Sequence, residues 1–151
     1  MYVKSVCVDM GVPVLSSSLE IGFFFVTPVS LGNPHAVCFV PNSPSEYPVE
    51  KWGPFLECHP QLGERSNVEF VQIVSHNKIC LRIWERGSKE TLSCGTGACA
   101  AAVCAIQQKG LENKVLAEVP GGTLTISWNG NREAVFLSGP AEFVFDVTVH
   151  M

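Results

Sequence analysis

Alternating apolar and polar positions predict that the first third of the chain is built from β-strands. Val3–Met10 places every second apolar side chain on one face and ends at a glycine- and proline-containing turn. Phe23–Ser30 and His35–Val40 show strand-like apolar runs, and Gly32-Asn33-Pro34 separates them. We therefore expect these two segments to be neighbouring strands joined by a tight connection.

Two segments instead show helical periodicity. Apolar residues spaced by three and then four positions predict a helix over Val49–His59, which Gly53-Pro54 would bend or split. Thr96–Lys109 predicts a longer helix that ends at Gly110, and small and apolar residues leave it almost no polar face. A helix that is apolar all round is a buried helix. We expect strands to wrap it on several sides and its N-terminus to open into a pocket.

The rest of the chain is predicted to be strands. A hairpin is expected from Val68–Ser75 and Lys78–Glu85, followed after the long helix by strands over Val115–Val119, Gly122–Trp128, Glu133–Leu137 and the alternating Phe143, Phe145, Val147 and Val149. Asn129-Gly130 is a dipeptide typical of a type I′ hairpin turn. The predicted fold class is α+β, a mainly antiparallel sheet curled around one central apolar helix.

Composition narrows the classes of function. A length of 151 residues suits a single domain over residues 1–151, and 46% hydrophobic with 16% charged residues is typical of a globular chain. A net charge of −4 argues against nucleic acid or an anionic membrane as a partner. No apolar run reaches the roughly 18 residues of a membrane span. No signal peptide is visible and no CxxC pair occurs among the seven cysteines, so we expect a cytoplasmic protein with reduced thiols and no metal site.

Cys94 is the first candidate for chemistry, because it stands immediately before the predicted helix, with Gly95, Thr96 and Gly97 following. A helix N-terminus carries unpaired N–H groups and a partial positive charge. We expect this to lower the thiol pKa from its free value of about 8.5. The same N–H groups can hold a carboxylate. The alternative is a small buried residue at a helix start that serves packing alone.

Three further segments contain candidates, each with a structural alternative. Glu85 and Arg86 follow a predicted strand and are either a solvated charge pair or groups that hold the ammonium and carboxylate of a ligand. His35 starts a strand after a rigid turn, and histidine can exchange a proton near neutral pH, although many histidines are simply hydrogen-bonded in place. Asn67 precedes an apolar strand and alone indicates little.

These positions belong to an ordered set of short motifs. The set comprises Val8-Asp9-Met10-Gly11-Val12-Pro13, Gly-Asn-Pro-His-Ala-Val at 32–37, Glu64-Arg65-Ser66-Asn67-Val68, Glu85-Arg86-Gly87 with Glu90-Thr91, Cys94-Gly95-Thr96-Gly97-Ala98-Cys99-Ala100, and Pro120-Gly121-Gly122-Thr123-Leu124. In order and spacing, this set closely resembles the C-terminal half of the diaminopimelate epimerase family. The resemblance covers nearly the whole chain.

The resemblance implies an epimerase that needs no pyridoxal phosphate or other cofactor and converts LL- to meso-diaminopimelate, in lysine and peptidoglycan synthesis. In such enzymes one cysteine thiolate removes the α-proton and an opposing thiol returns a proton on the other face. The resemblance assigns catalytic roles to Cys94, Glu85 and His35, and substrate binding to Asn33, Asn67, Glu85, Arg86, Gly95 and Thr96.

The sequence also departs from the family. The N-terminal half is missing, and with it the other cysteine; none of Cys7, Cys38 or Cys58 stands in the expected Cys-Gly-Asn-Gly context. Ser88-Lys89 replaces a pair of a small residue and glycine. We therefore expect half an active site, little activity alone, the N-terminal half as partner, and an exposed surface that favours a homodimer.

Other functions remain open at this stage. A related racemase or isomerase of the same fold would act on another substrate. A non-catalytic binding or assembly module would keep the scaffold without the reaction. A thiol-redox protein would need a second sulfur close to Cys94, and Cys99 is predicted to point elsewhere along the helix.

Overall fold

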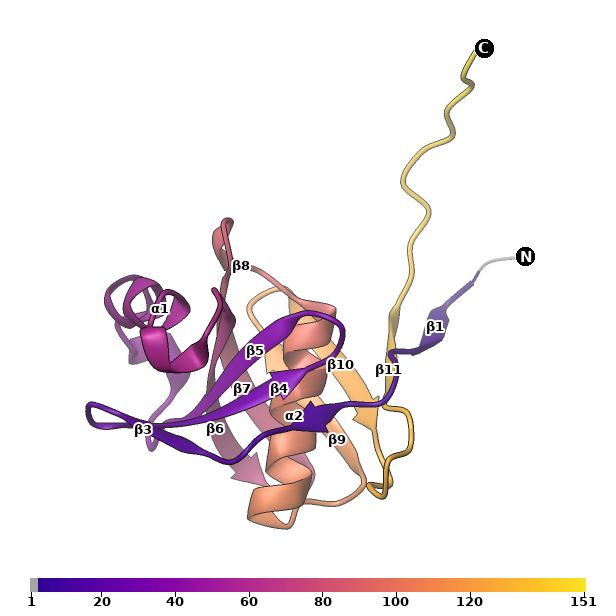
Figure 1. The fold of residues 1–151 in the computed structure, drawn as a ribbon. Helices are drawn as coiled ribbons and strands as arrows, with labels where there is room; N and C mark the ends of the chain where they lie inside the picture. Colours follow the sequence, from indigo (N-terminus) through magenta and orange to yellow (C-terminus); the bar gives the residue numbers. More distant parts are fainter. Residues whose placement is uncertain (1–2) are drawn as a thin grey trace.

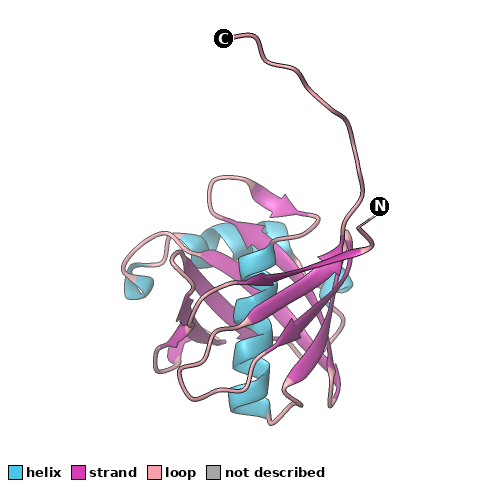
Figure 2. Cartoon of the chain, turned by 90° about the vertical axis from the view of Figure 1, so that its right-hand side faces the viewer, coloured by secondary structure: helices cyan, strands magenta, loops and turns pink. Residues whose placement is uncertain are grey.

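A computed structural model describes residues 3–151, in which eleven strands form one sheet around a central helix (Figures 1 and 2). The strands are β1 (Ser5–Asp9), β2 (Val14–Leu15), β3 (Leu19–Ile21), β4 (Phe24–Ser30), β5 (Pro34–Phe39), β6 (Asn67–Ser75), β7 (Lys78–Glu85), β8 (Lys89–Thr91), β9 (Lys114–Val119), β10 (Gly122–Ser127) and β11 (Phe136–Pro140). The helices are α1 (Val49–Glu57) and α2 (Gly95–Lys109), with short 3-10 turns at Pro44–Glu46 and Pro60–Leu62.

The sheet runs in the order β1-β11-β10-β9-β7-β6-β5-β4-β2, with β3 paired to β4 and β8 paired to β7. The β5–β6 and β7–β9 pairings are parallel and the other described pairings are antiparallel. The expected mainly antiparallel sheet is therefore confirmed, as is the β6–β7 hairpin. The parallel β5–β6 pair matters for the site, because it sets His35 beside Asn67.

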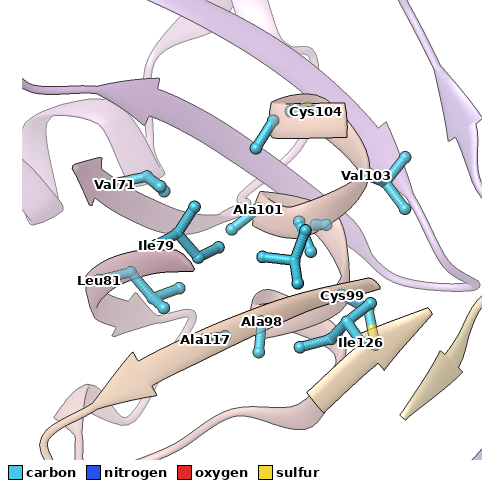
Figure 3. Close-up of a cluster of buried hydrophobic side chains, with 14 of the residues drawn as sticks. Val71, Ile79, Leu81, Ala98, Cys99, Ala101, Val103, Cys104, Ala117 and Ile126 are labelled. Carbon is cyan, nitrogen blue, oxygen red and sulfur yellow. The ribbon is translucent and has the colours of Figure 1, made fainter. Parts of the chain in front are cut away.

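Helix α2 is the centre of the core. Gly97 to Ala105 are fully buried, and small side chains allow strands to lie close to the helix on several sides. Figure 3 shows Val71, Ile79 and Leu81 on one side of α2 and Ile126 near its start. Burial of each large aliphatic side chain contributes about 1.5–3 kcal/mol. The helix ends as predicted at Gly110, whose φ of 69° is the left-handed conformation that glycine adopts readily.

Helix α1 continues through Gly53-Pro54, so of the expected bend or split the split does not occur. Packing explains this: Val49 and Leu56 are fully buried on its inner face. Gly53 also faces the indole of Trp84, and a Cβ there would lie 2.4 Å from Trp84 Cγ. The glycine thus permits a close contact between α1 and β7. Neither helix of the described residues has the length and apolarity needed to cross a membrane.

The tight turn predicted at Asn129-Gly130 is wrong. Ser127 pairs with Phe136, which leaves residues 128–135 as a longer connection. The indole N–H of Trp128 donates to the carbonyl of Glu133 at 3.0 Å, and the Trp128 ring is buried. Because the Trp128 side chain is buried, the backbone after β10 does not turn back directly into a hairpin. Strand β11 therefore begins later than the sequence pattern indicated.

The final predicted strand is also wrong. Residues 141–151 have no secondary structure and extend away from the body beside the N-terminal end of the chain (Figure 1, yellow). The alternating residues of this segment are more than 70% exposed, namely Phe143, Phe145, Val147 and Val149. A strand needs a neighbour to satisfy its backbone, and none of the described strands pairs with this segment.

Candidate active site

Cys94 is the N-cap of α2, as its position in the sequence predicted. Its backbone is extended (φ −137°, ψ 115°), and its Sγ accepts the N–H of Gly97 at 3.4 Å. The carbonyl of Cys94 accepts the N–H of Ala98 at 2.9 Å, which starts the helix. Cys94, Gly95 and Thr96 are half-buried, whereas residues 97–105 beyond them are buried. The sulfur therefore lies at the accessible start of a helix whose middle is enclosed.

The predicted lowering of the Cys94 pKa is wrong for this state of the protein. Burial raises the pKa of the thiol, and this outweighs the donors Thr96 and Gly97, which favour the thiolate. The negative charges of Glu85 and Glu69 raise it further. Cys94 is accordingly a thiol at neutral pH.

Asn33 and His35 reach Cys94 through Thr96. The amide Nδ2 of Asn33 donates to Thr96 Oγ1 at 3.2 Å, and Thr96 Oγ1 lies 3.6 Å from Cys94 Sγ. On its other side, Asn33 Oδ1 lies 3.1 Å from His35 Nε2. Asn33, in the turn before β5, thus makes hydrogen-bonding contact with the start of α2, and His35 reaches the helix only through Asn33.

Glu69 belongs to this network and was missed from the sequence. Its Oε1 lies 2.7 Å from His35 Nδ1, and both side chains are fully buried. Burial raises the pKa of the Glu69 carboxyl, against the opposing effect of His35. The available signal was a lone acidic residue inside the apolar strand β6, on the face that the alternation assigns to the core.

Asn67 joins two loops of the site. Its Nδ2 donates to the carbonyl of Pro34 at 3.1 Å, and its Oδ1 accepts the backbone N–H of Arg86 at 2.9 Å. Asn67 is almost completely buried. It holds the turn before β5 against the end of β7, so that the two predicted binding segments lie side by side.

The other two predicted residues are held at the end of β7. Glu85 Oε1 accepts the hydroxyl of Thr91 at 2.5 Å, and the Glu85 charge acts on Cys94. The exposed guanidinium of Arg86 donates to the carbonyl of Arg65 at 3.2 Å. Glu85 thus belongs to the surroundings of the thiol, whereas Arg86 is tied through its backbone to Asn67 and through its side chain to a neighbouring loop.

A buried carboxylate, that of Glu57, binds residues at the end of β7 and just after it. Glu57 at the end of α1 accepts the indole N–H of Trp84 at 2.8 Å and the backbone N–H of Gly87 at 3.3 Å, and it pairs with Arg65. Burial alone would raise the pKa of Glu57, but together the three donors outweigh it and the pKa is lowered. Glu57 is a second residue that the sequence pattern did not single out.

Two cavities of the described residues lie away from the helix tip, and the pocket expected at that tip stays a prediction. One of about 830 Å³ is lined by residues such as Leu15, Ile106 and Trp128, and one of about 240 Å³ lies beside Arg82 and Pro120. All seven cysteines are free, and burial raises the pKa of Cys99 to about 12. Within residues 3–151 no cluster of three or more metal-ligating side chains occurs.

Comparison with known proteins adds the family. The sequence profile described as diaminopimelate epimerase matches residues 27–144. This chain belongs to the diaminopimelate epimerase family. The diaminopimelate epimerase of Azotobacter vinelandii is 44% identical over an alignment that covers 97% of this chain and 58% of that protein. The diaminopimelate epimerase of Acetivibrio thermocellus is 42% identical, with coverages of 98% and 59%.

Solved structures agree on the fold. A hydroxyproline epimerase from Agrobacterium vitis matches with a TM-score of 0.68 over 91% of this chain and 50% of that chain, at 14% identity. A probable proline racemase from Agrobacterium radiobacter K84 matches with a TM-score of 0.63 over 95% of this chain and 54% of that chain, at 13% identity. The chain thus spans about three-fifths of its curated diaminopimelate epimerase relatives.

The departure from the diaminopimelate epimerase pattern at Ser88-Lys89 has a visible consequence. Lys89 adopts a φ of 63°, in the left-handed region that glycine adopts without strain. The glycine that the resemblance implies at this position would adopt the same backbone conformation without strain. Here the lysine adopts it at a conformational cost.

Proposed function

We propose that this chain is the C-terminal half of a two-domain diaminopimelate epimerase that works without pyridoxal phosphate, and that Cys94 is one of its two acid–base cysteines. The observation that carries the proposal is the half-buried Cys94 thiol at the tip of the buried helix α2, linked through Thr96 to Asn33 and His35. Asn67, Glu85 and Arg86 complete the substrate-binding set.

The geometry suits proton transfer at a carbon next to a carboxylate. Loss of the α-proton spreads negative charge onto that carboxylate, and the helix has no internal acceptor for the N–H groups of Gly95 and Thr96. Donors of this kind contribute about 3 kcal/mol each when they face developing charge. In this proposal Cys94 acts as the thiol partner, in agreement with the burial that raises its pKa. Its S–H proton moves to the α-carbon while a thiolate of the other half accepts the original proton from the opposite face.

After Cys94 has lost its proton, hydrogen-bond donors for the resulting thiolate are already in position. The N–H of Gly97 already points at Sγ, and the hydroxyl of Thr96 lies beside it. Both favour the thiolate, so its formation needs no rearrangement of the helix start. In the reverse direction the same thiolate removes the proton, with the two cysteines exchanging roles.

We further propose that the N-terminal half covers the side of the sheet that carries β1 and residues 141–151. Strand β1 is the outermost strand on that side, and Val6 and Val8 are more than 40% exposed. The neighbouring segment adds Phe143 and Phe145, both more than 70% exposed. Exposed apolar side chains gathered at one side of a sheet favour the docking of a partner. Without the other half, the same surface is expected to form a homodimer.

Solvent deuterium exchange tests the reaction. The purified 151-residue chain, incubated with diaminopimelate in D₂O, is expected to leave the α-carbon unlabelled. Adding the N-terminal portion of the Azotobacter vinelandii relative should restore labelling, measured by mass spectrometry. Cys94→Ala should abolish the restored exchange, and Cys58→Ser, at an exposed thiol, should not.

Rapid labelling by the chain alone would overturn the half-site proposal. Restored labelling that survives Cys94→Ala would remove Cys94 from the mechanism. Light scattering across a concentration series tests the homodimer separately, and a monomer at high concentration would contradict it.

A further inference from the structure

The hydrogen bonds around the buried pair of Glu69 and His35 determine how many protons the pair holds. Asn33 donates from Nδ2 to Thr96, so its Oδ1 is the atom that faces His35 Nε2 at 3.1 Å. A carbonyl oxygen is an acceptor only. His35 Nε2 must therefore carry a hydrogen, which it donates to Asn33.

The other ring nitrogen faces an acid. His35 Nδ1 lies 2.7 Å from Glu69 Oε1, a distance that requires a proton between the two atoms. Since Nε2 already holds one hydrogen, this second proton makes the ring an imidazolium beside a carboxylate, or leaves a neutral ring that accepts from a carboxylic acid. In either case the pair holds both protons and has no net charge.

The surroundings favour a pair without separated charges. Both side chains are fully buried, and Glu69 Oε2 is a buried side-chain oxygen without a hydrogen-bond partner among residues 3–151. An unpartnered oxygen is more costly on a carboxylate than on a carboxylic acid. Burial also raises the pKa of Glu69.

We propose that Glu69 is a positioning residue: it keeps a proton on the bridge to His35 Nδ1, so that the Nε2–H of His35 orients the Asn33 amide toward Thr96 and Cys94. This rests on the proposed function for its catalytic meaning. The connection runs Glu69–His35–Asn33–Thr96–Cys94 through side chains alone. In this arrangement Nε2 offers a hydrogen rather than a lone pair, so His35 orients its neighbour.

Two substitutions separate this role from simple packing. Glu69→Gln supplies an amide N–H in place of the acid proton, and so preserves the Nε2–H form of His35. Glu69→Leu keeps the bulk but removes the donor, which frees Nδ1 to hold the hydrogen instead. Glu69→Leu places an apolar group at a polar site, which can reduce folding. The test therefore rests on the comparison of Glu69→Gln with the unmodified chain.

The readout is the tautomer of His35 in the purified 151-residue chain. Long-range ¹H–¹⁵N spectra at pH 7 distinguish Nε2–H, Nδ1–H and imidazolium forms, and His35→Gln identifies the signal among the four histidines. The expected result is a hydrogen on Nε2 in the unmodified chain and the neutral Nε2–H form in Glu69→Gln. A neutral Nδ1–H ring in either protein would overturn the proposal.

Activity gives a second, distinguishable readout. In the complemented epimerase, Glu69→Gln should retain exchange, and Glu69→Leu should lose about 100-fold, the scale expected for a misplaced group. Equal activity of all three proteins would also overturn the positioning role. If no protein labels substrate, the proposed function fails while the tautomer result still decides the proton assignment.

Discussion

Cys94 Sγ lies close to the backbone of Gly97, and Glu69 also lies close to that glycine. No side chain at residue 97 would fit between the two. A Cβ on Gly97 would lie 3.3 Å from Sγ and 2.8 Å from Glu69 Oε1. The same glycine donates its N–H to the sulfur. The absence of a side chain at residue 97 therefore allows the Cys94 thiol and Glu69 of β6 to pack against the same turn of α2.

Gly97→Ala is accordingly expected to destabilise the chain, although alanine favours a helix by about 1 kcal/mol. Overpacking against a buried carboxyl costs about 1–3 kcal/mol, so after the helix-propensity gain the net loss in the free energy of unfolding should be about 0–2 kcal/mol. Gly95→Ala is the matched control, since its Cβ would meet only the flexible end of Leu137 at 3.0 Å. Urea denaturation measures both, and equal effects would show that the contact with Glu69 is unimportant.

The raised pKa of Cys94 predicts slow alkylation. In a Cys7→Ser/Cys58→Ser background, the rate of iodoacetamide reaction at Cys94 should rise with a midpoint above that of an unstructured cysteine peptide, because burial disfavours the thiolate. Thr96→Val removes a hydroxyl that favours the thiolate, so it should move the midpoint to still higher pH. Mass spectrometry of the peptide containing Cys94 follows the rate. A midpoint at or below that of the free peptide would contradict the assignment.

The local pattern predicted most of the elements, because strand alternation and helix periodicity depend on near neighbours in sequence. The β6–β7 hairpin and helix α2, with its stop at Gly110, follow this rule. Two failures have one physical origin. The alternation over residues 141–151 is real, but a strand forms only against a partner, and the turn at Asn129-Gly130 yields to the burial of Trp128.

The motifs selected residues that lie together in the structure, whereas their roles stay predictions and their electrostatics did not follow from the sequence. The motifs placed Cys94, Asn33, His35 and Asn67 correctly near one another. The pKa of Cys94 depends on burial by the whole sheet, which no local spacing reveals. Glu69 lies 34 positions from its partner in the sequence, and the sequence offered no means of pairing the two.

The lowered pKa of Glu57 predicts acid sensitivity. A carboxyl with a lower pKa in the folded state adds stability above its unfolded value of about 4.5, and this is lost as the pH falls through the folded value. Glu57→Gln should lower the free energy of unfolding by about 2 kcal/mol at pH 7, the scale of hydrogen bonds to a charged group, and by less below pH 4. Denaturation at both pH values measures this. Glu64→Gln, at an exposed position nearby, is the control and should change neither.

The backbone strain at Lys89 predicts that glycine at this position stabilises the chain. A side chain in the left-handed region costs about 1–2 kcal/mol, whereas glycine there loses about 0.5–1 kcal/mol through the freedom of its unfolded chain. Lys89→Gly should therefore raise the free energy of unfolding by about 0.5–1 kcal/mol. Ser88→Gly, one residue earlier and outside the left-handed region, should lower it by a similar amount. Thermal and urea unfolding of the two variants measure these changes. If both variants changed the free energy of unfolding in the same direction, backbone strain at residue 89 would not be the cause.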